Sequence, residues 1–89
     1  MIYGSDLYAV AIEDLDFWKK SGNVMILKRI RQLIEAIQIT PYAGIGKPER
    51  LKYEWSDWYS RRINAEHRIV YKCFDNKIIV YSVRYHYQK

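Results

Sequence analysis

The stretch Y59-S-R-R-I-N-A-E-H-R-I-V-Y71 decides the fold, because it contains two strand signals and the turn between them. Aromatic and β-branched residues favour strands, and they lie on both sides of the small and polar segment N64-A-E66. The stretch predicts a β-hairpin with strands over residues 58–63 and 67–74. If residues 64–66 form a three-residue loop, Arg62 pairs with Arg68 and both side chains lie on one face.

Further segments extend this hairpin into a sheet. Residues 77–87 are rich in Tyr, Ile, Val and Arg, and the preceding D75-N76 favours a turn. Residues 50–53 are compatible with a short strand before the hairpin, and residues 2–8 with another at the N-terminus. The expected sheet is therefore antiparallel, with four or five strands.

The N-terminal half of the chain has helical periodicity. In residues 9–20, Leu15 and Trp18 share one face, acidic residues come early and lysines come late, as the helix dipole favours. In residues 24–39, Leu and Ile recur at helical spacing. Two helices are therefore expected before the sheet.

Three residues set the ends of these helices. Gly22 suits a left-handed stop, Asn23 suits the next N-cap, and Pro41 ends the second helix. Because 89 residues make a single domain, we expect one α+β domain over residues 1–89, with both N-terminal helices packed on one face of the sheet.

Composition limits the class of protein and its partners. A formal net charge of +5 suits a polyanionic partner such as nucleic acid or an acidic protein. A single cysteine, Cys73, excludes an internal disulfide and fits the reducing cytoplasm. The N-terminus has neither the basic region nor the apolar stretch of a signal peptide, and no run is long enough to span a membrane. We expect a cytoplasmic protein without a membrane partner.

Cationic and aromatic side chains alternate through the C-terminal half. Cations that bind phosphates, together with rings that stack on unpaired bases, are typical of single-stranded RNA binding. The alternative is that the rings belong to the core and the arginines are solvated. The cations are Lys47, Arg50, Lys52, Arg61, Arg62, Arg68, Lys72 and Arg84, and the rings are Trp55, Trp58, Tyr59, Tyr71, Tyr81, Tyr85 and Tyr87.

The same region contains the groups needed to cleave RNA without a metal. That reaction needs a base for the 2′-hydroxyl, an acid for the leaving 5′-oxygen, and cations that hold the phosphate and offset its growing charge. His67 is a rival to the acid, but as the neighbour of Arg68 it should face the other way. The candidates are Glu49 as base, His86 as acid, Arg68 as charge stabiliser, Lys52 and Arg62 as phosphate ligands, and Tyr85 and Tyr87 as stacking or positioning groups.

The register of the last hairpin tests this assignment. With a three-residue loop over residues 75–77, Arg68 pairs with Arg84 and His86 falls on the same face. A two-residue turn places Arg68 and His86 on opposite faces. Shared chemistry therefore requires an odd loop length or a β-bulge.

Metal and cofactor chemistry are not expected. His67, Cys73 and His86 do not have a standard zinc-binding spacing, and Cys73 in mid-strand suits a small core residue. The G44-I-G-K47 segment lacks the glycine spacing and preceding strand of a phosphate-binding loop.

Several motifs together resemble the YoeB (Txe) family of toxins within the RelE superfamily. They are D16-F-W-K-K-S-G-N23, T40-P-Y-A-G-I-G-K-P-E49, K47-P-E-R-L-K52, the hairpin Y59–Y71, and R84-Y-H-Y87, and they span nearly the whole chain in order. The resemblance implies a compact fold like that of microbial ribonucleases.

The resemblance also implies a function: a ribosome-dependent mRNA endonuclease of a type II toxin–antitoxin pair, which leaves a 2′,3′-cyclic phosphate. The implied partners are the ribosome with its mRNA and a cognate antitoxin, and several family members form homodimers. The implied roles are those of base for Glu49, of transition-state arginine for Arg68 and of acid for His86, with Lys52 and Arg62 at the phosphate and Tyr87 closing the site.

The chain departs from the family pattern in one region. Arg50 replaces a proline, and Trp55, Asp57 and Tyr59 stand where leucine, glycine and tryptophan are usual. Because glycine reaches backbone conformations that aspartate adopts less easily, the loop before Tyr59 is expected to differ. Two alternatives stay open: a basic module that binds RNA without cutting it, and a protein that only docks an acidic partner.

Overall fold

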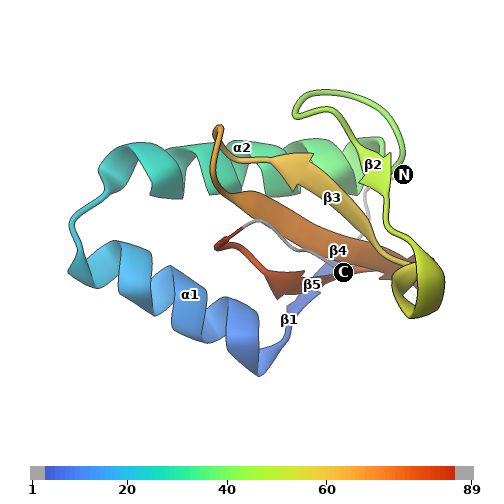
Figure 1. Ribbon diagram of the computed structural model, residues 1–89, viewed down its shortest axis with the longest axis horizontal. Coiled ribbons are helices and arrows are strands. Elements are labelled where there is room, and N and C mark those ends of the chain that lie inside the picture. Colours follow the sequence, from blue (N-terminus) through green and yellow to red (C-terminus); the bar gives the residue numbers. More distant parts are fainter. Residues whose placement is uncertain (1–3, 86–89) are drawn as a thin grey trace.

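The computed structural model describes residues 4–85 (Figure 1). Two helices are followed by most of a five-stranded sheet, and one short strand precedes them. The elements, in chain order, are β1 (Gly4–Leu7), α1 (Ala9–Lys20), α2 (Val24–Ile39), β2 (Glu49–Arg50), a 3₁₀ turn η1 (Tyr53–Trp55), β3 (Tyr59–Arg62), β4 (Arg68–Phe74) and β5 (Lys77–Ser82).

Both helices have the bounds that the periodicity predicts. Gly22 between them has φ of 71°, the left-handed conformation that glycine adopts without strain. The side chain of Asn23 accepts a hydrogen bond from the backbone N–H of Ile26 at 3.2 Å, which caps α2 as expected. Local side-chain chemistry thus sets the joint between the helices.

The sheet has the strand order β1-β5-β4-β3-β2, and one pairing differs from the antiparallel expectation. The pairs β2–β3, β3–β4 and β4–β5 are antiparallel, whereas β1 lies parallel to β5, so the sheet is mixed. The sequence of a strand does not determine which other strand it pairs with. Here the packing of α1 against β5 places β1 at that edge of the sheet.

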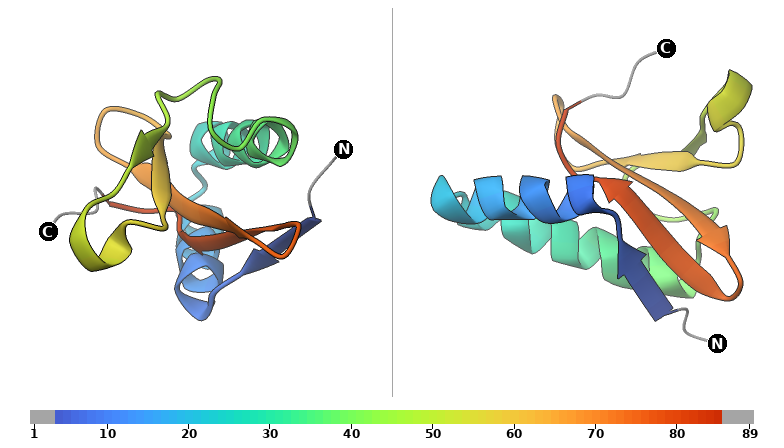
Figure 2. Two further views of the ribbon diagram at one scale, coloured as in Figure 1. Left: turned by 90° about the vertical axis from the view of Figure 1, so that its right-hand side faces the viewer. Right: turned by 90° about the horizontal axis from the view of Figure 1, so that it is seen from below.

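The two helices lie along one face of the sheet and bury the core there (Figure 2). Trp18, Ile30 and Leu33 from the helices pack with strand residues such as Ile69 and Val80, and all five are at most 5% exposed. The opposite face of the sheet, which we call the open face, is not covered by either helix (Figure 2). This α+β architecture confirms the expected fold class.

The strand ends differ from expectation where the backbone leaves the sheet. The segment 50–53 was expected to be a strand, but only Glu49–Arg50 pair with β3, and the chain then turns into η1. Asp57 does not have a positive φ, whereas Tyr53 does, at 59°. Asp57 therefore does not adopt the left-handed conformation that glycine would favour, and the residue of this loop that does adopt it is Tyr53.

The last hairpin contains a bulge. Its turn has two residues, because Phe74 pairs with Lys77, and this turn alone would put the expected catalytic groups on opposite faces. The register then shifts by one residue: Tyr71 pairs with Val80, but Val70 pairs with Ser82. The extra residue is Tyr81, so the register beyond it is the one that a loop of odd length would give, whereas His86 itself lies outside the described residues. The condition set by the sequence, an odd loop or a bulge, is confirmed.

Candidate functional site

Strand pairing brings Glu49, Arg62 and Arg68 to the open face. Glu49 pairs with Ser60, and Arg62, two residues further along β3, pairs with Arg68. Residues in register, and residues two apart on a strand, project from the same face. One carboxylate and two guanidinium groups therefore share a surface, as the hairpin register predicts.

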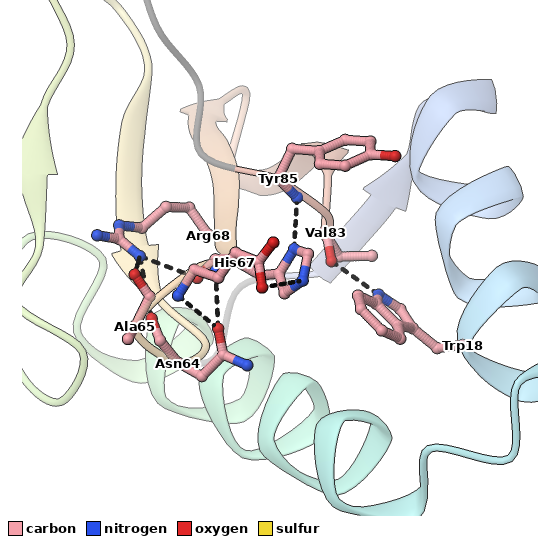
Figure 3. Close-up of polar contacts among 8 residues, drawn as sticks. Trp18, Asn64, Ala65, His67, Arg68, Val83 and Tyr85 are labelled. Atoms are coloured by element: carbon pink, nitrogen blue, oxygen red, sulfur yellow. Dashed lines mark hydrogen bonds and ion pairs between the residues drawn. The ribbon is translucent and has the colours of Figure 1, made fainter.

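Arg68 is the buried member of this group. It is 7% exposed, and its Nη1 donates to the backbone oxygens of Asn64 at 3.0 Å and His67 at 3.2 Å (Figure 3). Burial lowers the pKa of the Arg68 guanidinium from its usual value; the charge of Arg62 acts in the same direction and that of Glu49 opposes it. The turn thus holds one charged group in a fixed orientation.

The other basic candidates are exposed around this group. Arg62 is exposed beside Arg68, while Lys47 and Lys52 are exposed on either side of Glu49. Lys47 has φ of 52°, and Lys52 is the N-cap residue that precedes η1. These three cations are exposed, Arg62 in register with Arg68 and the two lysines close to Glu49 in sequence, and such a set suits an RNA backbone.

Arg61 is not part of this cationic surface. It was grouped with the cations of the sheet, but it has no exposed surface and lies on the helix-covered side of β3. Neighbouring strand residues face opposite ways, so Arg61 points to the helix-covered face when Arg62 points to the open face. Sequence reasoning missed Arg61 as a structural residue because arginine is rarely buried without a charged partner.

The proposed acid, His86, and the closing tyrosine, Tyr87, lie outside the described residues. The described chain ends at Tyr85, which is 58% exposed and has φ of 67°. Its ring lies 6.0 Å from the His67 ring and 4.5 Å from the guanidinium carbon of Arg84.

His67 faces away from Arg68, as expected, and holds the C-terminal segment. Its Nδ1 accepts a hydrogen bond from the backbone N–H of Tyr85 at 2.7 Å, and its ring packs edge-on against Trp18 of α1 at 4.8 Å (Figure 3). Trp18 Nε1 in turn donates to the Val83 carbonyl at 3.0 Å. The Nδ1 atom of His67 thus serves as an acceptor that supports the backbone at Tyr85.

Aromatic rings occupy the remainder of the open face. Trp58 lies 5.8 Å from Tyr81 and 5.7 Å from Tyr8, and the ammonium group of Lys72 lies 4.8 Å above the Trp58 ring. Trp58 is only 8% exposed. Part of the aromatic set expected to bind bases is therefore packed, which supports the core interpretation for these rings.

Three of the four departures from the family pattern line one pocket of about 350 Å³. The pocket is lined by Arg50, Asp57 and Tyr59, by Tyr42 from the loop after α2, and by residues at the end of β4. The Nε of Arg50 donates to the Ser56 carbonyl at 2.6 Å, so the substituted arginine closes the loop that contains Asp57.

Residues 4–85 contain neither a cluster of metal-binding side chains nor a helix that could span a membrane. No group of three or more His, Cys, Asp and Glu side chains is placed to hold a metal ion there. Neither described helix is long and apolar enough to cross a membrane.

Comparison with known proteins finds relatives that match most of this chain. A family model for the YoeB-like toxin of bacterial type II toxin–antitoxin systems matches residues 8–87. Toxin YoeB of Synechocystis sp. is 49% identical over 72 residues, which cover 81% of this chain and 84% of that protein.

Two solved structures from Staphylococcus aureus have the same fold. A YoeB dimer has a TM-score of 0.87 at 38% identity, and a YoeB–YefM complex has a TM-score of 0.85 at 39% identity. Each comparison covers 98% of this chain and 100% of the other.

Proposed function

This chain belongs to the YoeB-like toxins of bacterial type II toxin–antitoxin systems, and from that premise we propose that it is an endoribonuclease that cleaves mRNA in the ribosomal A site. Cleavage proceeds by metal-independent acid–base catalysis and leaves a 2′,3′-cyclic phosphate, which stops translation. The single observation that carries the proposal is the convergence of Glu49, Arg62 and Arg68 on the open face.

Each step of the reaction has a residue. The Glu49 carboxylate takes the proton of the ribose 2′-hydroxyl, and the 2′-oxygen attacks the adjacent phosphorus. The bond from phosphorus to the 5′-oxygen breaks, and His86 protonates that oxygen, so the products are a cyclic phosphate and a 5′-hydroxyl. Arg68 offsets the charge that builds on the phosphate oxygens, and its buried, preoriented guanidinium suits this role.

Binding groups surround this centre. Lys52 and Arg62 hold the scissile phosphate and Lys47 holds a neighbouring one, because exposed cations next to Glu49 can follow an RNA backbone. Tyr85 and Tyr87 stack on or position the nucleotide. No cofactor takes part in this scheme.

The proposed partners follow from the target and from the relatives. The chain binds the ribosome and its mRNA, which places its action in the cytoplasm. A YoeB of Staphylococcus aureus is known both as a dimer and in complex with YefM. By analogy, a cognate antitoxin neutralises this chain, and a homodimer is its other expected assembly.

The positive charge around the proposed site predicts that the cleavage rate depends on the bound substrate complex. His86 lies in sequence beside the cationic Arg84 and, if it shares the site, near Arg68, so the positive charges disfavour its protonated form until the RNA phosphate is bound. We expect little cleavage of free RNA and strong cleavage of mRNA on programmed ribosomes.

The test is expression of the chain alone, with 5′ ends of translated mRNA mapped by primer extension. We expect breaks at fixed positions within codons, and 5′-hydroxyl ends on the downstream fragments. Glu49→Gln should reduce cleavage on purified ribosomes by about 100- to 10,000-fold, the usual contribution of an acid or base. The matched control is Glu35→Gln, an exposed glutamate on α2.

The outcomes separate the proposal from its alternative. Ribosome binding with uncut mRNA would identify a non-catalytic binding module. Full activity of Glu49→Gln would remove this residue from the mechanism, even if the chain is a nuclease.

A further inference from the structure

Arg61 is a completely buried arginine whose guanidinium binds one loop. It lies in β3 with no exposed surface and donates to the backbone oxygens of Thr40, Ala43 (2.7 Å) and Ile45 (3.3 Å). Its Nε also donates to the hydroxyl of Tyr71 at 3.1 Å. Within residues 4–85 no carboxylate forms an ion pair with it, so its charge is balanced by carbonyl dipoles alone.

Tyr71 completes this arrangement from the neighbouring strand. Its side chain is fully buried, and its hydroxyl donates to the Pro41 carbonyl at 2.7 Å while accepting from Arg61. Burial raises the pKa of the Tyr71 hydroxyl, which keeps the donating proton in place at neutral pH. Arg61 and Tyr71 therefore act together on four carbonyl groups of residues 40–45.

The end of this loop is tied to the same strand. The backbone N–H of Arg62 donates to the Gly46 carbonyl at 2.7 Å. Gly46 has φ of 85°, and a Cβ atom there would lie 3.0 Å from Leu33 and 3.1 Å from Arg61. The loop therefore packs directly on Arg61, at a position where only glycine fits without strain.

The position of Glu49 depends on this loop. Glu49 follows Gly46 by three residues, and the strand that contains it, β2, pairs with β3 through only two residues. A two-residue ladder at the edge of a sheet offers few bonds to fix a side chain. The Leu51 N–H donates to the Trp58 carbonyl at 2.9 Å on the side that follows Glu49, and the attachment of the 40–46 loop constrains the side that precedes it. Arg61 and Glu49 thus lie on opposite sides of the sheet but are linked through residues 40–48.

We propose that Arg61 is a positioning residue, whose buried guanidinium, together with Tyr71, fixes the 40–46 loop and thereby holds Glu49 in register with the face that contains Arg68. The inference rests on the proposed role of Glu49 as the base. Arginine is required because its planar fork donates to several carbonyls at once, which a lysine ammonium cannot match in this geometry.

The test compares three variants on programmed ribosomes under single-turnover conditions. Tyr71→Phe removes only the hydroxyl, and Arg61→Lys keeps the charge but loses the fork. Both should lower the maximal cleavage rate, by about 10-fold and about 100-fold respectively, with little change in ribosome affinity, because a displacement of about 1 Å has that effect. Ile78→Val, in the core on β5, controls for a general loss of stability.

A second measurement reports on the loop without using activity. Amide hydrogen exchange at Arg62, whose N–H binds Gly46, should become at least about 10-fold faster in Tyr71→Phe and Arg61→Lys but not in Ile78→Val. Folded variants with wild-type exchange at Arg62 and wild-type rates would overturn the inference.

The two proposals fail in different ways. If the wild-type chain does not cut mRNA, the proposed function is wrong, and the exchange data still decide whether Arg61 holds the loop. If Glu49→Gln is inactive while Tyr71→Phe and Arg61→Lys keep full activity, the proposed function stands and the positioning role of Arg61 is wrong.

Discussion

Asp14 lies on α1, but its carboxylate accepts a hydrogen bond from the backbone N–H of Val83 at 3.0 Å, just beyond the end of β5. Both residues are buried, and Val83 has no exposed surface. Asp14→Ala should lower the free energy of unfolding by about 1–3 kcal/mol, because the buried N–H loses its partner. Asp14→Asn keeps an acceptor oxygen and should cost less, and urea unfolding of both variants measures the difference.

The same carboxylate makes a prediction about pH. Burial raises the pKa of Asp14 above its usual value of 3.8, with the Val83 N–H and the charge of Arg84 opposing this shift. The folded protein therefore holds this proton more tightly than the unfolded chain. The stabilisation that comes from this tighter proton binding is fully present below pH 3.8 and is lost as the pH rises through the higher folded-state pKa.

Asp14→Asn isolates this effect from other carboxyl groups. Relative to the Asn variant, the wild-type protein should lose stability as the pH rises from below 3.8 toward neutral, after which the difference should stay constant. Urea unfolding of both proteins across this range measures it. A difference that is flat, or that changes in the opposite direction, would show that burial does not dominate at this site.

Single residues also show where sequence reasoning reaches its limit. The pairing of Arg62 with Arg68 follows from the length of a turn, so it could be predicted. It could not be predicted that Arg61, and not its neighbour Arg62, is the buried arginine, because the alternation of a strand states only that neighbouring residues face opposite ways. The carbonyls that make its burial possible come from residues 40–45, far away in the sequence.

At the scale of elements, the turn between β4 and β5 carries strain that a substitution can relieve. Asp75 and Asn76 have φ of 54° and 61°, which are both positive, as a two-residue hairpin of this hand requires. Asn76→Gly should raise the free energy of unfolding by about 0.5 kcal/mol, since Asp-Gly is among the favoured pairs for this turn. Thermal unfolding followed by circular dichroism measures the change.

The other hairpin turn provides the control for this prediction. Ala65 is exposed and does not have a positive φ, so Ala65→Gly adds freedom to the unfolded chain without relieving strain. The free energy of unfolding of Ala65→Gly should fall by about 0.4–1 kcal/mol. If both glycine variants are destabilised alike, the left-handed conformation at Asn76 carries no cost that glycine can remove.

Elements whose signals are local could be predicted, and those that depend on distant partners could not. The cap at Asn23 and the stop at Gly22 define both helices from neighbouring residues alone. The parallel pairing of β1 with β5 depends instead on how α1 packs. The bulge at Tyr81 could be stated only as a condition, because strand propensity does not distinguish a turn of three residues from a turn of two with a bulge.

At the scale of the whole molecule, the fold separates two surfaces of different character. The helices face the sheet with apolar side chains, while the open face presents Arg62, Lys72 and the buried Arg68. The net charge of +5 indicated a polyanionic partner, but composition does not show which surface binds it. That assignment needs the strand register.

Salt dependence can locate the polyanion-binding surface. Each phosphate contact on single-stranded RNA contributes about 0.7 to the slope of log K against log salt concentration, because bound counterions are released. Arg62→Gln, on the open face, should therefore weaken binding of a short single-stranded RNA and reduce that slope by about 0.7. Arg31→Gln, exposed on α2, removes the same charge from the helix layer and should leave the slope unchanged. Fluorescence anisotropy over a range of salt concentrations measures both variants.

The change of slope in the two variants decides which surface binds RNA. Equal loss of slope in the two would mean that RNA responds to the overall charge of the molecule, and an unaltered slope in Arg62→Gln would remove this residue from the phosphate ligands. A slope near zero for the wild-type chain would instead favour a basic face that serves only to dock an acidic protein.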